Sequence, residues 1–345
     1  MKILHTADWH LDAPLQGHSE QLRQALAAVP GKIFEICKQE HCDLVLIAGD
    51  LFDGPYTPHS YQNLYDVLKA MEVPVFITPG NHDHIGPDSP WNKELWPENV
   101  HIFTGISSVG LQNLDLRVYG AGFESMDCPA LLEGFRAEQT ETYAVGIFHG
   151  DPTQVNSPYN PITKLQVQNS GLDYLALGHI HKADSFTAGK TLCAWPGCPM
   201  GKGYDEQGEK GVYIVDLQET ANIRFIPLDT PRFYDLECAP SQLSSILPPV
   251  GNSDYYRITL TGSCDVPDLG ALQAEFSRFP NLVLRDKTTR PVDVWGSLGQ
   301  DNFEGVYFGL LKQATETATE EELQEILLAA ELSRQLLDGQ EVVLP

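Results

Sequence analysis

Apolar residues in the first half of the chain occur in short runs, and polar side chains follow each run. The runs are rich in Val, Ile and Leu and are too short for helices, so we expect buried strands. Five of them cover residues 2–4, 44–47, 73–78, 144–148 and 175–177. In an open α/β sheet, ligands bind beyond the carboxyl ends of the strands. The polar residues after the five runs are therefore expected to meet at one crevice.

Segments with helical periodicity lie between the first three of these apolar runs. One helix is expected over Ser19–Glu40, with Ser19 as its N-cap and a kink or break at Pro30-Gly31, and another over Tyr61–Met71. This βαβαβ opening predicts a sheet that begins parallel. From Leu114 onward, strand-like runs follow one another without helices and include a hairpin over Asp184–Trp195. These returning strands suggest a second sheet.

The expected fold is α/β, of the α+β type: a sandwich of two β-sheets flanked by helices, followed by a small α/β domain and C-terminal helices. A turn-rich stretch near Pro227–Pro231 suggests the first boundary, which gives domains over 1–228, 229–300 and 301–345. The two terminal helices are expected at Phe303–Ala314 and Leu323–Leu337. A capping box, Thr319 with Glu322, introduces the second.

Charge and composition narrow the class of protein. The 345 residues include 22 Lys and Arg against 47 Asp and Glu, a formal net charge of −25, which disfavours unaided binding to a polyanion. The seven cysteines are odd in number and contain no Cys-x-x-Cys pair, so a disulfide framework is not expected. Without a signal peptide or a run of about 20 apolar residues, the chain is expected to be cytoplasmic, with no membrane partner.

The side chains after the five runs are of metal-ligand types. They occur as Asp8-Trp-His10, Gly49-Asp-Leu-Phe-Asp53, Gly80-Asn-His-Asp83, His149-Gly150 and Gly178-His-Ile-His181. Any one of these is commonplace, and a single His such as His149 is more often structural than a ligand. Carboxylate, imidazole and amide groups together suit Mn²⁺, Fe or Zn²⁺ better than Mg²⁺. A pair of such ions, bridged by a carboxylate, cleaves phosphate esters well.

The ordered series Asp-x-His, Gly-Asp-x-x-Asp, Gly-Asn-His-Asp, His and Gly-His-x-His spans residues 8 to 181 and resembles the calcineurin-like metallophosphoesterase superfamily. Within it, the start Lys2-Ile-Leu-His-Thr-Ala-Asp-Trp-His-Leu and the forms Gly-Asp-Leu-Phe-Asp and Gly-His-Ile-His-Lys resemble the SbcD type of DNA double-strand-break repair nuclease. The small domain then resembles the capping domain of those nucleases, although no motif supports that part.

The resemblance implies two divalent ions, Mn²⁺ first, with Fe or Zn as alternatives. It places Asp8, His10 and His181 on one ion, Asn81, His149 and His179 on the other, and Asp50 between the two. It also implies that a cationic His82 neutralises charge on the phosphate and protonates the leaving oxygen. Asp53 would orient His82, at a position where some repair nucleases have His.

Three functions remain open from the sequence. The resemblance implies a DNA exonuclease or endonuclease that acts in repair beside an SMC-like ABC ATPase, with the terminal helices as the docking element. A hydrolase of nucleotides or small phosphate esters is the rival enzyme. A non-catalytic scaffold that binds DNA ends or the ATPase is the rival from another class. The terminal helices could equally pack on their own domain, and a homodimer is also open.

Overall fold

The computed structural model describes residues 1–15, 20–291 and 293–339. Two compact units divide the chain. The first contains Met1–Asp235 and Ser253–Arg257, and the second contains Leu236–Asn252 and Ile258–Pro345. The domain limits expected near residues 228 and 300 stay predictions.

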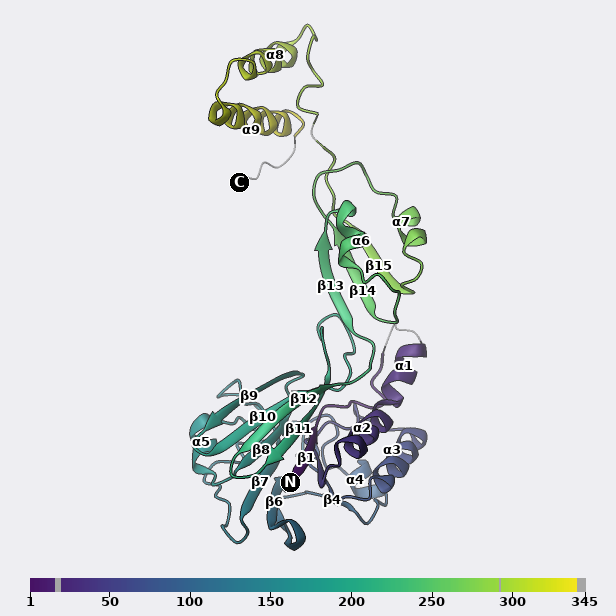
Figure 1. The fold of residues 1–345 in the computed structure, drawn as a ribbon, viewed down its shortest axis with the longest axis vertical. Coiled ribbons are helices and arrows are strands. Elements are labelled where there is room, and N and C mark those ends of the chain that lie inside the picture. The colour runs from purple at the N-terminus through teal and green to yellow at the C-terminus, as the bar shows by residue number, and fades with distance from the viewer. Residues whose placement is uncertain (16–19, 292, 340–345) are drawn as a thin grey trace. The chain divides into compact units, whose positions relative to one another are not determined.

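Two six-stranded sheets form the first unit, with strand orders β12-β11-β1-β2-β3-β4 and β5-β6-β7-β8-β10-β9. In Figure 1, β12, β11 and β1 can be followed in that order. The first sheet contains β1 (Lys2–Thr6), β2 (Leu44–Ile47), β3 (Val75–Ile77), β4 (Val100–Ile102), β11 (Gly211–Leu217) and β12 (Ala221–Pro227). The second contains β5 (Ser107–Leu111), β6 (Leu116–Ala121), β7 (Tyr143–His149), β8 (Tyr174–Gly178), β9 (Lys182–Ala188) and β10 (Thr191–Gly197). A short 3-10 helix, η1 (Gln112–Leu114), joins β5 to β6.

The two sheets face each other across a shared apolar core, which confirms the predicted sandwich. Leu46 and Phe76 of the first sheet and Val145, Ile147 and Ala176 of the second are buried in the same cluster. Inward-facing aliphatic residues from both sheets remove their side chains from water together, and this burial is the main force that holds the layers.

Helices cover the outer face of the first sheet. They are α1 (Glu20–Ala27), α2 (Val29–Glu40), α3 (Pro58–Ala70) and α4 (Pro90–Lys93), whereas α5 (Lys164–Asn169) contacts β9 and β10 of the second sheet. Ile33 of α2 and Leu64 of α3 are buried with Val45 of β2. The predicted break near Pro30 is confirmed, because the helix divides at Ala28 and the proline lies in the first turn of α2. The N-cap expected at Ser19 lies outside the described residues.

The strand pairing confirms that the first sheet begins parallel, but it places β11 and β12 in a different sheet from the one expected. β1, β2, β3 and β4 pair in parallel, and β9 and β10 form the predicted hairpin. The expectation that all strands after Leu114 build the second sheet is wrong for β11 and β12. β11 pairs antiparallel with β1, with Val215 opposite Ile3, and so extends the first sheet. This pairing covers the free edge of β1 and buries Val215 in the core between the sheets.

The second unit contains most of a three-stranded sheet of order β13-β14-β15 and the terminal helices. Its elements are β13 (Phe233–Cys238), η2 (Pro240–Gln242), α6 (Leu243–Ile246), β14 (Tyr255–Leu260), α7 (Leu269–Glu275), β15 (Asn281–Asp286), α8 (Phe303–Thr315) and α9 (Glu320–Leu337), with β13 and β14 beginning in the first unit. The predicted capping box at Thr319 is present at the start of α9. Across residues 1–15, 20–291 and 293–339, no helix has the length and apolar character needed to cross a membrane.

The terminal helices α8 and α9 contact each other. Phe308 and Ala330 are fully buried, and the Tyr307 and Ser333 hydroxyls are 2.8 Å apart. The Arg334 guanidinium donates to the Glu304 carboxylate at 2.7 Å. The pair therefore buries one side of each helix against the other.

Candidate metal centre

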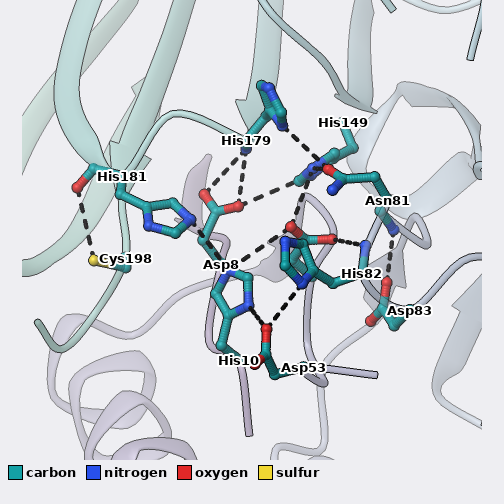
Figure 2. A network of polar contacts seen from close by, with 12 residues as sticks. Asp8, His10, Asp53, Asn81, His82, Asp83, His149, His179, His181 and Cys198 are labelled. Atoms are coloured by element: carbon teal, nitrogen blue, oxygen red, sulfur yellow. Dashed lines mark hydrogen bonds and ion pairs between the residues drawn. The ribbon is translucent and has the colours of Figure 1, made fainter. Parts of the chain in front are cut away.

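The predicted residues lie at or just after the ends of five strands, and Figure 2 shows most of them together in one network of polar contacts. Asp8 follows β1, Asp50 follows β2 and Asn81 follows β3 in the first sheet, whereas His149 ends β7 and His179 follows β8 in the second. Because these parallel strands present their carboxyl ends at the same edge of the sandwich, motifs up to 171 residues apart become neighbours. Each residue of the predicted site lies within hydrogen-bond or ion-pair distance of another.

On one side of the site, Asp8, His10 and His181 converge. Their potential ligand atoms lie within 4.8 Å of one another. The Nε2 atoms of His10 and His181 are 3.1 Å apart. Two imidazole nitrogens directed at one point, with a carboxylate beside them, can bind a single divalent cation.

On the other side, Asn81, His149 and His179 converge. The Asn81 Oδ1 atom lies 2.9 Å from His149 Nε2 and 3.2 Å from His179 Nδ1. The Nδ1 atom of His149 lies 2.9 Å from the Ala48 carbonyl oxygen. The tautomer with its proton on Nδ1 donates to this carbonyl and leaves the Nε2 lone pair available to a cation, beside the Asn81 oxygen.

Asp50 lies between the two sides. Its Oδ2 atom is 3.4 Å from His149 Nε2 and 3.7 Å from His10 Nε2. Its Oδ1 atom accepts the backbone N–H of His82 at 2.9 Å, and the side chain is only 2% exposed. One buried carboxylate thus reaches both histidine groups, which is the geometry that a bridging ligand requires.

The backbone is strained at several of these residues. Asp8, His10, Asp50 and His179 have φ values of 55°, 48°, 53° and 92°. A non-glycine residue in this left-handed region costs about 1–3 kcal/mol and persists only when its surroundings hold it there. Such strain often clusters at functional sites. The fold holds these four side chains in directions that relaxed strand ends would not give them.

His82 and Asp53 lie at the open side of the site. The His82 Nδ1 atom is 2.9 Å from Asp53 Oδ1, and its side chain is 45% exposed. Hydrogen bonding to Asp53 raises the pKa of His82 above its ordinary value, and hydrogen bonds from His10 and His82 hold the pKa of Asp53 well below its usual range. The same Oδ1 atom also lies 2.9 Å from His10 Nδ1. Asp53 therefore contacts both an expected metal ligand and the expected acid.

Asp83 fastens the loops that carry these groups. Its Oδ1 atom accepts the Gly80 N–H at 2.7 Å, and its Oδ2 atom accepts the Leu51 N–H at 2.8 Å. These bonds join the loop after β3 to the loop after β2. Asp83 thereby fixes the position of Asp50 relative to Asn81 without facing the histidines itself.

Two residues beside the centre were not found from the sequence. Glu206 Oε1 lies 2.5 Å from His181 Nδ1, and Lys202 Nζ lies 3.9 Å from the same oxygen. Both residues belong to the long loop between β10 and β11, where Gly and charged residues alternate without a motif. Only the fold, which returns this loop to the end of β8, reveals their position.

The donor set fits a pair of divalent ions. Two groups of ligand atoms, one around Asp8, His10 and His181 and the other around Asp8, Asp50 and His149, each lie within 4.8 Å. Carboxylate and imidazole groups of this kind bind Mn²⁺, Fe and Zn²⁺. Desolvation of so many polar groups is costly unless cations or hydrogen bonds compensate it. Asp8 belongs to both groups, and Asp50 lies near His149 of one and His10 of the other, so these residues could hold two ions with Asp50 between them.

Sequence comparisons agree with this geometry. Over 241 residues the chain is 30% identical to the metallophosphoesterase YhaO of Bacillus subtilis strain 168, which covers 63% of this chain and 57% of that protein. It is 27% identical over 265 residues to SbcD of the SbcCD nuclease from the same strain, covering 63% of this chain and 66% of the relative. With SbcD of the SbcCD nuclease from Staphylococcus epidermidis, identity is 24% over 313 residues, covering 78% and 81%.

The similarity to YhaO and to the B. subtilis SbcD protein thus spans less than two thirds of each relative's length. A family model for calcineurin-like phosphoesterases matches residues 1–183, which is more than half of the chain and includes every predicted site residue. The chain belongs to the calcineurin-like phosphoesterase family.

Proposed function

We propose that the protein is a two-metal phosphodiester hydrolase whose substrate is DNA, cleaved as an exonuclease or endonuclease in DNA repair. The main observation in support of a hydrolase is the position of Asp50, whose Oδ2 atom lies 3.4 Å from His149 Nε2 and 3.7 Å from His10 Nε2. Asp8, His10 and His181 are the proposed ligands of one ion. Asn81, His149 and His179 are the proposed ligands of the other.

Two bound divalent ions would supply Lewis-acid polarisation of the phosphate and a water activated at neutral pH, and Mn²⁺ is the proposed metal, with Fe or Zn as alternatives. His82 is the proposed general acid, because its half-exposed ring can meet a substrate and its contact with Asp53 favours the protonated form. A positioned imidazolium can stabilise charge on the phosphate and give its proton to the leaving oxygen. Asp53 fixes the direction in which the ring points.

The choice of DNA rests on similarity to the SbcD proteins of two bacteria. The net charge of −25 opposes long-range attraction of a polyanion. Two lysines near His181 add local positive charge that partly offsets this, although Lys202 lies beside Glu206 and Lys210 is buried and donates to the His181 carbonyl oxygen at 3.0 Å. We therefore expect weak DNA affinity for the chain alone.

Substrate and metal dependence separate the three functions. The protein, stripped of metal with a chelator, is incubated with and without Mn²⁺ on labelled DNA, on bis-p-nitrophenyl phosphate and on cyclic nucleotides. Cleavage of DNA that requires Mn²⁺ and is lost in Asp50→Asn supports the proposal. Activity on the small esters alone would replace the nuclease with a small-molecule phosphodiesterase, and inactivity on every substrate would favour the scaffold.

The terminal helices are the proposed docking site for an SMC-like ABC ATPase partner. Although Phe308 is buried, Phe303, Val306 and Leu310 on the same helix are 72%, 62% and 63% exposed. An apolar helical face of this kind suits insertion into a groove on another protein. We propose that the ATPase covers this face and supplies a basic DNA-binding surface, which would offset the net charge of −25 on this chain.

Substitution of the exposed face tests the partner. Val306→Ser with Leu310→Ser should abolish co-purification of the ATPase and leave Mn²⁺-dependent hydrolysis of bis-p-nitrophenyl phosphate unchanged. Val250→Ser, at an apolar residue that is 75% exposed, is the matched control. Retention of the ATPase by the double variant would refute docking at α8. Self-association that the double variant abolishes would instead assign the face to a homodimer.

A further inference from the structure

A carboxylate outside the proposed ligand set contacts one of the proposed metal-binding histidines. Glu206 Oε1 lies 2.5 Å from His181 Nδ1, and the Glu206 side chain is 11% exposed. Its other oxygen, Oε2, accepts the backbone N–H of Lys202 at 2.7 Å. Lys202 also places its Nζ atom 3.9 Å from Oε1. The hydrogen bond from Lys202 thus holds the carboxylate in place within its own loop, independently of its contact with His181.

The contact determines what His181 can offer a cation. A carboxylate only accepts hydrogen bonds, so His181 Nδ1 must carry a proton toward Glu206. In the neutral ring the Nε2 atom then keeps a lone pair, and that atom lies 3.1 Å from His10 Nε2, inside the proposed site. A carboxylate behind an imidazole fixes the tautomer and the ring orientation and makes the ligand nitrogen more basic.

The two sides of the site differ in whether a carboxylate contacts the Nδ1 atom of the proposed ligand histidine. His10 and His181 are each in contact with a carboxylate through Nδ1, at 2.9 Å from Asp53 and 2.5 Å from Glu206. On the other side, the Nδ1 atom of His149 contacts the neutral carbonyl of Ala48 at 2.9 Å, and the Asp8 carboxylate is farther from it, with Oδ1 at 4.0 Å. The histidines of one proposed ion are therefore more electron-rich than the corresponding histidine of the other.

We propose that Glu206 is a positioning residue for His181 and makes the Asp8, His10 and His181 side the tighter of the two metal positions. This inference rests on the proposed two-metal function. It adds a residue that neither the motifs nor the family match identifies, because Glu206 lies beyond the matched residues 1–183. It also predicts that the two ions bind in sequence, the carboxylate-supported side first.

A separate metal site at His181, Cys198 and Glu206 is the competing explanation, since their ligand atoms lie within 4.8 Å. The geometry opposes it. At 2.5 Å, His181 Nδ1 and Glu206 Oε1 are in direct hydrogen-bond contact, whereas an ion bound to both would lie about 2.0–2.2 Å from each and would force them apart. The Cys198 sulfur is 3.9 Å from Glu206 Oε2 and 3.7 Å from the His181 carbonyl oxygen.

Metal titration of Glu206→Gln tests the proposal. Gln keeps the size of the side chain and removes its charge. Equilibrium dialysis of the full chain with Mn²⁺, with free Mn²⁺ read by its EPR signal, should give two binding steps in the wild type. In Glu206→Gln the tighter step should weaken about 10–100-fold and the weaker step should stay unchanged. The matched control is Glu209→Gln in the same loop, whose carboxylate pairs with Arg232 at 3.0 Å, and it should titrate like the wild type.

A double-mutant cycle shows whether Glu206 acts through His181. In a His181→Ala background, Glu206→Gln should cause no further loss of Mn²⁺ affinity. Additive losses in this cycle would overturn the proposal. So would equal weakening of both steps, or an unchanged titration, in Glu206→Gln. A single binding step in the wild type would also overturn it. Thermal unfolding of the metal-free variants separates a lost ligand from a lost fold. The readout is binding, so a wild type that binds two ions stepwise but cleaves nothing would refute the hydrolase alone.

Discussion

His82 and Asp53 form the part of the site whose roles can be separated most sharply by substitution. His82 is 45% exposed and its Nδ1 atom contacts Asp53 Oδ1 at 2.9 Å, whereas Asp53 also contacts His10. Removing His82 should therefore take away an acid and leave every proposed metal ligand in place. Removing the charge of Asp53 should disturb both the acid and the ligand.

The expected size of the effect follows from these contacts. His82→Ala should lower kcat by about 10²–10⁴, the usual contribution of positioned proton transfer, which corresponds to about 2.7–5.5 kcal/mol of transition-state stabilisation. Its Mn²⁺ affinity should equal that of the wild type. Asp53→Asn should lower kcat and also weaken Mn²⁺ binding about 10–100-fold, because it removes the carboxylate behind His10.

The assay is hydrolysis of bis-p-nitrophenyl phosphate over a range of Mn²⁺ concentrations, with Mn²⁺ binding measured in parallel. At saturating Mn²⁺, the variant that carries both substitutions should be no slower than His82→Ala, because Asp53 acts on the chemical step through His82. Loss of Mn²⁺ from His82→Ala would make it a ligand. An unchanged rate in His82→Ala, or a further loss of rate when Asp53→Asn is added, would refute the roles assigned here.

Three further predictions concern stability and packing. His5 is fully buried, and burial lowers its pKa from 6.5 to about 3. The unfolded chain therefore binds a proton at His5 that the folded protein does not, so the free energy of unfolding falls as the pH drops from 6.5 toward 3. Urea unfolding in the presence of a chelator should show that His5→Gln removes about 2 kcal/mol of this fall between neutral pH and pH 5. Gly49→Ala should abolish Mn²⁺ binding in equilibrium dialysis, since its Cβ would lie 2.3 Å from His149 Nδ1, whereas Gly54→Ala, with positive φ but open space, should cost only stability. Phe308→Ala should destabilise the pair of terminal helices by about 3–5 kcal/mol, and hydrogen exchange should increase in α8 and α9 but not in β1; unchanged exchange would contradict the packing described.

The sequence predicted the sandwich and the convergence of its motifs for one physical reason. Short apolar runs identify buried strands, and parallel strands place their carboxyl ends together, so Asp8 and His179 could be expected to meet although 171 residues separate them. The helix break near Pro30 and the capping box at Thr319 were predictable because both depend on local chemistry.

Features that depend on long-range pairing were not predictable. The run at Gly211–Leu217 has the pattern of a buried strand in either sheet, and only the free edge of β1 assigns it to the first. Glu206 lies in an irregular loop whose composition resembles any charged surface loop. Its contact with His181 arises because the fold returns that loop to the end of β8.

The central claim is a pair of metal ions that share Asp50. Anomalous X-ray diffraction from crystals of the Mn²⁺-loaded protein, collected above and below the manganese absorption edge, tests it most directly. The account predicts two peaks about 3.5–4 Å apart, one beside His10 and His181 and the other beside Asn81 and His149, with Asp50 between them. A single peak, or peaks away from Asp50, would contradict it.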